Sequence, residues 1–308
     1  MINRVLIRSK VLQMVYAYYQ KENASLYDSE KEFIESLEKS YELYHYLLLL
    51  MCDITYYAEK RIDIGRNKYL PTEEEKNPNT RFIDNKFVAQ LRENHALDHF
   101  VNTHKISWDQ HEQVIKALYE QIVTSPAYLE YMQADGCSYE DDKEVWRKIF
   151  KQTISNGTEL AEAMEESCIY WNDDLDIVLT FVIKTIKRFE EEKGAEQELL
   201  PMFKDASDKL FALQLFRASI QRGDEYRQLI MSSVKNWELE RLAMMDLLIL
   251  QIALAEIMEI EEIPLNVSFN EYIDLAKVFS TEKSGTFING TLDHLVQQLK
   301  KENKLFKN

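Results

Sequence analysis

The stretch at residues 249–257 reads ILQIALAEI. Its apolar side chains recur three and four positions apart, which is the spacing of one face of an α-helix. That face consists of Ile249, Ile252, Ala253 and Ile257. The stretch therefore predicts a helix near residues 240–260 with one side buried against other helices.

The same helical periodicity extends over most of the chain. Its 308 residues include only 7 Gly and 5 Pro, which leaves few turn signals. Strand signals are nearly absent. We therefore predict an all-α fold of long helices joined by short polar loops. The expected helices lie near residues 4–20, 29–61, 108–123, 174–193, 206–221, 224–235, 240–260, 269–279 and 286–302.

Local signals predict one further helix, which begins at residue 126, and refine two of the helices named above. Ser125 followed by Pro126 is typical of an N-cap with proline at the first helical position. Ser268 and Glu271 have the spacing of a capping box for the helix at 269–279. The pair Asn289-Gly290 is a hairpin dipeptide, but its flanks keep the helical period. We therefore expect Gly290 to lie within a helix, at a place where two helices approach closely.

One segment loses the periodicity and is the best linker candidate. Residues 65–80 hold Gly65, Pro71, Pro78 and the acidic run from Glu73 to Glu75. We expect three parts: a first helix at 1–20, a helical extension at 21–200 with this linker near 65–80, and a helical bundle at 201–308. The residues assign no role to the extension.

The charge is strongly negative overall and positive at both ends. The chain carries 37 basic and 53 acidic residues, a net charge of −16. Residues 1–21 nevertheless hold four basic residues and no acid, and residues 295–308 hold four lysines against one acid. This pattern excludes a general polyanion-binding surface and favours a local anion site near the chain ends.

The cysteines and the N-terminus indicate a cytoplasmic protein. Cys52, Cys137 and Cys168 are odd in number and widely spaced, which is typical of reduced thiols. The N-terminus lacks the apolar core of a signal peptide. The apolar run 47–52 is too short to span a bilayer, so we expect no membrane association.

The C-terminal third holds a series of motifs in a fixed order. Residues 236–242 read NWELERL, residues 249–257 read ILQIALAEI, residues 269–277 read FNEYIDLAK and residues 287–293 read FINGTLD. This series resembles the NusB family, whose pattern is roughly N-W-x-(x)-x-R-L, I-L-R-x-A-x-x-E-L, I-N-E-x-V-x-L-A-K and F-V-N-G-V-L-D. Gln13 and Tyr16 match the family's opening A-x-Q-x-L-Y. The clear resemblance covers about residues 2–20 and 205–300.

The resemblance implies a fold of two packed three-helix bundles and a role in transcription antitermination. It implies binding of single-stranded boxA-like RNA of ribosomal RNA operons together with the ribosomal protein NusE. That complex would join RNA polymerase and other Nus factors. The resemblance implies no cofactor.

The resemblance also implies which residues of the first helix contact RNA. Arg4 and Arg8 align with arginines of the family's RNA-binding segment, and guanidinium groups suit phosphate contact and base stacking. Val5 and Leu6 stand where further arginines are common. We expect Lys10 to compensate from a neighbouring position. The alternative is that both arginines are ordinary solvated charges.

Further RNA-binding residues are implied near the fourth motif. Lys283 precedes it and is expected to add a phosphate contact, whereas Thr286 stands where the family often has lysine. Phe287 is expected either to stack on a base or to pack in the core. The same two roles are left open for Tyr16, which is expected either to pack in the core or to contact RNA.

Two residues of the 240–260 helix bear on partner binding. Asp246 matches an acidic family position that faces NusE, and the alternative is a solvated helix charge. Gln251 replaces the arginine of the family's I-L-R element. We expect this replacement to alter a local ion pair and to leave the fold intact.

We expect no enzyme activity. The sequence has no glycine-rich phosphate loop, no H-E-x-x-H, no C-x-x-C and no nucleophile elbow. His95 and His99 are four apart and share a helix face, but their surroundings do not favour a metal site. NusB-like domains also occur in ribosomal RNA methyltransferases, yet a methyl-donor-binding segment is absent here. The remaining alternative is a helical protein-protein scaffold with little RNA affinity.

Overall fold

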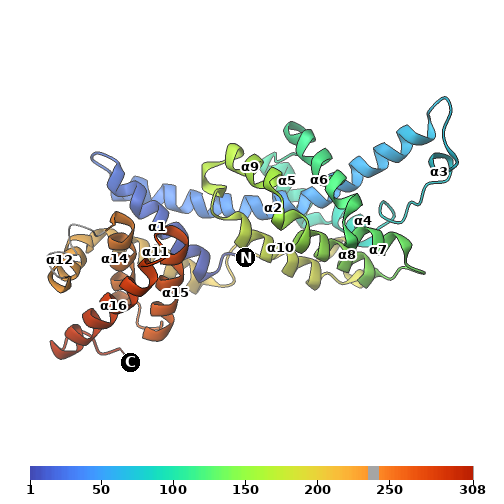
Figure 1. Cartoon of the computed structure of the whole chain (residues 1–308). Helices are drawn as coiled ribbons and strands as arrows, with labels where there is room; N and C mark the ends of the chain where they lie inside the picture. Colours follow the sequence, from blue (N-terminus) through green and yellow to red (C-terminus); the bar gives the residue numbers. More distant parts are fainter. Residues whose placement is uncertain (235–242, 308) are drawn as a thin grey trace. The chain divides into compact units, whose positions relative to one another are not determined.

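The computed structural model describes residues 1–234 and 243–307 (Figure 1). Within these ranges the only extended pairing is one isolated bridge between Ile2 and Phe203, and the regular elements are all helices. The all-α prediction is confirmed. The chain forms two compact units. We call residues 2–37 with 203–308 the terminal unit, and Met1 with residues 38–202 the middle unit.

The terminal unit is built around one central helix, α14. Residues 248–257 of α14 are all buried, because the helix is apolar on nearly every side. Five other helices, α1, α11, α12, α15 and α16, pack against it (Figure 1). The helices of this unit are α1 (Arg4–Gln20), the first part of α2 (Leu26–Arg66), α11 (Ala206–Gln221), α12 (Gly223–Ser233), α14 (Met244–Glu259), α15 (Leu265–Phe279) and α16 (Ser284–Lys301).

The first turns of α2 pack within the terminal unit. The rings of Phe33 on α2 and Phe216 on α11 are both fully buried and stack with their centroids 4.7 Å apart. Nearby, Arg217 pairs with Glu30 at 2.5 Å. This compact unit therefore extends to Leu37, beyond the residue 20 at which the predicted first part ends.

The middle unit is a second helical bundle centred on α8. Trp146, Ile149 and Phe150 of α8 are fully buried, and α4, α7 and α10 pack against this helix. The α-helices of the unit are the rest of α2, α3 (Glu73–Lys76), α4 (Lys86–Arg92), α5 (His95–His104), α6 (Glu112–Thr124), α7 (Pro126–Gln133), α8 (Tyr139–Gln152), α9 (Thr158–Ser167) and α10 (Leu175–Arg188). Its 3-10 helices are η1 (Asp109–His111), η2 (Ile154–Asn156), η3 (Ile169–Trp171) and η4 (Glu191–Glu196).

The segment at 65–80 joins helices of the same unit. It runs from the end of α2 to the approach of α4 and contains α3, which Thr72 caps by accepting a hydrogen bond from the backbone N–H of Glu75 at 3.2 Å. Both flanking helices contribute to the middle unit. The loss of periodicity therefore marks a long connection within one bundle.

Several local predictions hold and two are wrong. Ser125 caps α7, whose first residue is Pro126, as the sequence indicates. The capping box at Ser268 and Glu271 is wrong, because α15 already begins at Leu265 and Ser268 lies inside it. The close approach at Gly290 is also wrong, since a Cβ placed there would meet no atom within 4 Å.

The close approach occurs instead at Gly223. A Cβ on Gly223 would lie 2.8 Å from the Nε2 atom of Gln251 and even nearer to the hydroxyl of Tyr19. The predicted helices at 206–221 and 224–235 leave Gly223 between them, whereas it is the first residue of α12. A side chain at residue 223 would have to displace the ends of the Tyr19 and Gln251 side chains, because α12 starts against α1 and α14.

Two remaining predictions concern thiols and membranes. Cys52, Cys137 and Cys168 are free thiols, as their spacing indicates. Among the described helices, none combines the length and the apolar character needed to cross a bilayer. The motif at 236–242 and the start of the predicted helix at 240–260 lie mainly outside the described residues.

Candidate nucleic-acid interface

Arg8, one of the two predicted RNA-binding arginines, is buried in the terminal unit. Its side chain is only 3% exposed. Both carboxylate oxygens of Glu256 on α14 accept hydrogen bonds from it, from Nε at 2.8 Å and from Nη2 at 2.9 Å. Its Nη1 atom pairs with Glu271 on α15 at 3.0 Å. The guanidinium is thus held by two carboxylates and has no open face.

Glu256 is the centre of this buried network. The residue is fully buried and also accepts hydrogen bonds from the hydroxyls of Ser268 at 2.8 Å and Tyr272 at 3.0 Å. A buried carboxylate is stable only when its oxygens have donors, and four donors reach this one. Ser268 and Glu271, which the sequence suggested as a helix cap, therefore serve to join α1, α14 and α15.

Electrostatics keep Arg8 charged and Tyr272 protonated. Burial alone lowers the pKa of Arg8, but the hydrogen bonds to Glu256 and the nearby negative charges raise it above its usual value. Burial, together with the charge of Glu256, raises the pKa of Tyr272 well above its usual range. The guanidinium stays charged and the phenol stays protonated, so both remain hydrogen-bond donors to Glu256.

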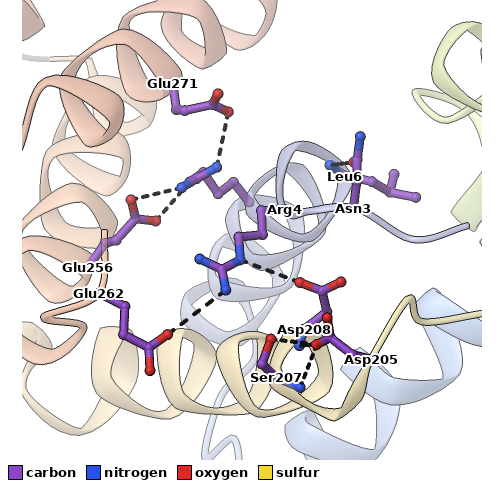
Figure 2. Close-up of polar contacts among 10 residues, drawn as sticks. Asn3, Arg4, Leu6, Asp205, Ser207, Asp208, Glu256, Glu262 and Glu271 are labelled. Atoms are coloured by element: carbon purple, nitrogen blue, oxygen red, sulfur yellow. Dashed lines mark hydrogen bonds and ion pairs between the residues drawn. The ribbon is translucent and has the colours of Figure 1, made fainter. Parts of the chain in front are cut away.

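Arg4 lies one turn earlier on α1 and is held more loosely. Its side chain is 30% exposed, with Nε 3.4 Å from Asp208 and Nη2 4.0 Å from Glu262 (Figure 2). Its guanidinium carbon lies 4.9 Å from the ring centre of Phe211. Ion pairs this long and this exposed contribute little stability, so the guanidinium remains available to an anion.

The other predicted residues of α1 divide between core and surface. Lys10 is fully buried, which differs from the expected position on a basic edge. Tyr16 is 39% exposed and its ring is therefore partly open to solvent. One turn further along α1, Gln20 donates a hydrogen bond to the sulfur of Met244, the first residue of α14.

The residues around the fourth motif form the start of α16. Lys283 is exposed, precedes the first residue of the helix and has no ion pair with any described residue. Thr286 is also exposed, and Phe287 is half-buried. Phe287 thus retains both roles that the sequence leaves open, packing and contact with a base.

Asp246 lies beneath this loop, in the first turn of α14. It is 8% exposed, and its Oδ2 accepts a hydrogen bond from the hydroxyl of Ser284 at 3.1 Å. Its other oxygen, Oδ1, has no hydrogen-bond partner among the described residues. A buried carboxylate oxygen without a donor is costly, so this position favours a donor from outside the described residues.

The residues predicted to bind RNA and NusE lie at two different ends of α14. Arg4 pairs with Glu262, which follows the last residue of α14, whereas Lys283 and Asp246 lie at the first turn of the same helix. The 16 residues of α14 span about 24 Å at 1.5 Å per residue. The C-terminal end of α1, with Tyr16 and Gln20, is the part that approaches the Lys283 end.

One cation near this end escaped the sequence analysis. The guanidinium carbon of Arg227 on α12 lies 3.7 Å from the ring centre of Tyr19, and its Nε donates to Gln251 at 2.7 Å. Gln251 is fully buried and also donates to the carbonyl of Ser219 at 2.6 Å. Gln251 therefore supports a stacked arginine by hydrogen bonds. No motif marks Arg227, since its place depends on contacts with α1 and α14.

The histidines do not converge on one site. His95 pairs with Glu196 at 2.9 Å, and the ring of His104 stacks on Phe100. Throughout residues 1–234 and 243–307, no group of three or more His, Cys, Asp or Glu side chains is placed to hold a metal ion. The chemistry available at the interface is therefore that of exposed cations, aromatic faces and one unsatisfied carboxylate.

Comparison with known proteins identifies the family. The NusB family profile matches residues 177–297. A protein of Salinibacter ruber named transcription antitermination protein NusB is 37% identical over 132 residues, which is 41% of this chain and 82% of that protein. A protein of Clostridium botulinum strain Kyoto with the same name is 34% identical over 155 residues, 50% of this chain and 96% of that protein.

A third relative of the same name, from Gloeobacter violaceus, is 36% identical over 115 residues, covering 36% of this chain and 54% of the relative. No solved structure matches the chain. The matched segments carry the motifs that build α14, α15 and α16, and two relatives are covered over most of their length. On these grounds the chain belongs to the NusB family.

Proposed function

We propose that this protein is a transcription antitermination factor that binds single-stranded boxA-like leader RNA of ribosomal RNA operons together with the ribosomal protein NusE. In this role it would act in an RNA polymerase antitermination complex with other Nus factors. The observation that carries the proposal is the similarity to relatives named transcription antitermination proteins, of which the chain covers 82% and 96%. That coverage means that nearly a whole relative is contained in this chain.

We assign RNA contact chiefly to the surface at the Lys283 end of the terminal unit. An exposed lysine, a half-buried phenylalanine and a partly exposed tyrosine lie there, at Lys283, Phe287 and Tyr16. Single-stranded RNA is bound by cations that meet phosphates and by rings that stack on bases. Arg4 is a separate contact at the far end of α14. Arg8 and Lys10 are buried, so we assign Arg8 to the fold and draw no RNA contact for Lys10.

Replacing Lys283 by alanine is expected to weaken boxA-like RNA binding about threefold to tenfold. The exposed ammonium would lose one phosphate contact, so the slope of log affinity against log salt should fall by about 0.7. Fluorescence anisotropy with a labelled RNA oligonucleotide at several salt concentrations measures both quantities. Lys277→Ala is the matched control, because Lys277 is an equally exposed lysine on α15 that already pairs with Asp274 at 2.7 Å. Equal effects of the two variants would contradict the assignment.

We assign NusE contact to the position of Asp246. Asp246→Asn is expected to lower NusE affinity about tenfold, since a charge-assisted hydrogen bond to Oδ1 would be lost. The same substitution should leave the folding stability unchanged or slightly raised, because Oδ1 has no donor within the described chain. Titration calorimetry with NusE and thermal unfolding measure the two effects. Asp293→Asn, on the exposed face of α16, is the control; loss of stability without loss of affinity in Asp246→Asn would refute the contact.

The burial of Arg8 and Lys10 also favours a second candidate, a protein-binding scaffold with little RNA affinity. The net charge of −16 points the same way, because it repels a polyanion. The two candidates differ in one measurement. An antitermination factor binds boxA-like RNA more tightly when NusE is present, whereas a scaffold binds NusE and leaves the RNA free.

A further inference from the structure

The middle unit carries most of the negative charge of the protein. Its 165 residues from 38 to 202 include 32 acidic and 19 basic side chains, so 13 of the 16 net negative charges lie there. Such a charge repels nucleic acid and attracts cationic partners.

A cavity of about 260 Å³ opens in the middle unit between α2 and the segment formed by η1 and α6. Aromatic and acidic side chains line it, together with Lys60 and Lys116. The ring of Tyr56 is 50% exposed, whereas Trp108 is buried, stacked on Tyr46 at 4.0 Å and anchored by its Nε1, which donates to the carbonyl of Tyr46 at 3.0 Å. The cavity therefore has a rigid aromatic wall and a more open aromatic rim.

The acidic side of the cavity lacks a neutralising partner. Asp53 and Asp109 both line it, and neither carboxylate has a hydrogen bond or an ion pair with the described residues. Burial and the charge of Asp109 raise the pKa of Asp53 to about 6, against the opposing influence of Arg92 and Lys60. The cations already present thus fail to compensate the two carboxylates, and a further cation would do so.

The exposed aromatic rim already attracts a cation of the chain itself. The ammonium nitrogen of Lys60 lies 4.4 Å from the ring centre of Tyr56, within the range of cation–π attraction. A guanidinium suits this combination better than an ammonium. It stacks flat on a ring and offers paired N–H groups to carboxylates.

A second cavity adjoins the first. Its volume is about 580 Å³, it is lined by Tyr46, Trp171 and Glu166 among others, and it shares Asp109 with the first cavity. Tyr46 also forms the stack behind Trp108. Two adjoining cavities of this size fit consecutive side chains of a polypeptide better than one small amine.

We propose that the middle unit binds a basic polypeptide segment by taking an arginine side chain into the cavity formed by Asp53, Tyr56, Trp108 and Asp109. The guanidinium pairs with the two carboxylates and stacks against the tyrosine ring. The neighbouring cavity receives the next part of the segment. This surface is separate from the residues assigned to RNA and NusE, so its test is independent of the proposed antitermination role.

Binding of a fluorescein-labelled hexa-arginine peptide to the full chain tests the proposal. We expect saturable binding that Asp53→Asn/Asp109→Asn weakens about tenfold or more, since two charge-assisted contacts are lost. The matched control is Asp63→Asn/Glu120→Gln. It removes two exposed carboxylates from α2 and α6 outside the cavity and should change the affinity less than twofold. Circular dichroism melting establishes that each variant is folded.

Three further arms separate the proposal from its rivals. Tyr56→Leu keeps both carboxylates. It should lower the affinity for the arginine peptide more than the affinity for a hexalysine peptide. Bound peptide should protect backbone amides at 53–60 and 105–116 from hydrogen exchange. Spermidine should compete only weakly. Equal losses in the cavity and control variants, protection elsewhere, or spermidine binding as tight as the peptide would each overturn the proposal.

Discussion

Arg8→Ala is expected to destabilise the terminal unit by about 3–5 kcal/mol. Removal of the guanidinium leaves Glu256 fully buried with only Ser268 and Tyr272 as donors. An ionised carboxylate stripped of its cation in the protein interior is far costlier than the ion pair itself. The helix α1 also loses its polar link to α14 and α15, so its packing is weakened as well.

Urea unfolding followed by far-UV circular dichroism measures this loss. Arg4→Ala is the matched control, four residues earlier on the same helix, and should cost less than about 1 kcal/mol because its ion pairs are exposed. Arg8→Met/Glu256→Met should recover much of the stability, since it removes both charges together. A stable Arg8→Ala protein that has lost RNA affinity would reverse our assignment and make Arg8 an RNA contact.

Phe33→Ala is expected to destabilise the terminal unit by a similar amount, about 3–5 kcal/mol. Its ring is fully buried and stacks on Phe216 of α11 at 4.7 Å, so truncation opens a cavity and removes an aromatic pair. The effect should be confined to the terminal unit, because the first turns of α2 pack there.

Hydrogen exchange monitored by mass spectrometry resolves the two units. We expect protection to fall in α11 and α14 and to stay unchanged in α8 and α10. Tyr27→Ala, on the same part of α2 but with a side chain that is 68% exposed, should have little effect. If protection fell equally in α8 and α10, the two units would not unfold separately, and residue 37 of α2 would not mark a boundary between them.

Much of the helical architecture follows from residue spacing. Periodicity and turn residues predict α1 and α11 with the ends that the structure has and α7 with its first residue, and they place α14, α15 and α16 in order. These signals work because a helix is set by contacts within a few residues. Where they fail, at Gly223 and Gly290, the outcome depends on which distant helix passes nearby.

The candidate site was less predictable than the fold. Arg4 and Arg8 are four residues apart and equally polar, so no local pattern separates them. Arg8 faces inward only because Glu256 and Glu271, which lie 248 and 263 residues further along the chain, converge on it. Ser268 and Glu271 have the spacing of a helix cap, but in the folded chain they contact Glu256 and Arg8, which lie on other helices.

Residue spacing and composition were enough to predict that the chain is all-helical, that its C-terminal motifs carry the NusB pattern and that both ends of the chain have a net positive charge. The burial of Arg8 and Lys10, the placement of Arg4 and Lys283 at opposite ends of α14 and the cavity with aromatic lining in the acidic middle unit became evident only from the folded chain. Helix formation depends on neighbours in the sequence. The exposure of a charge depends on partners that only folding brings together.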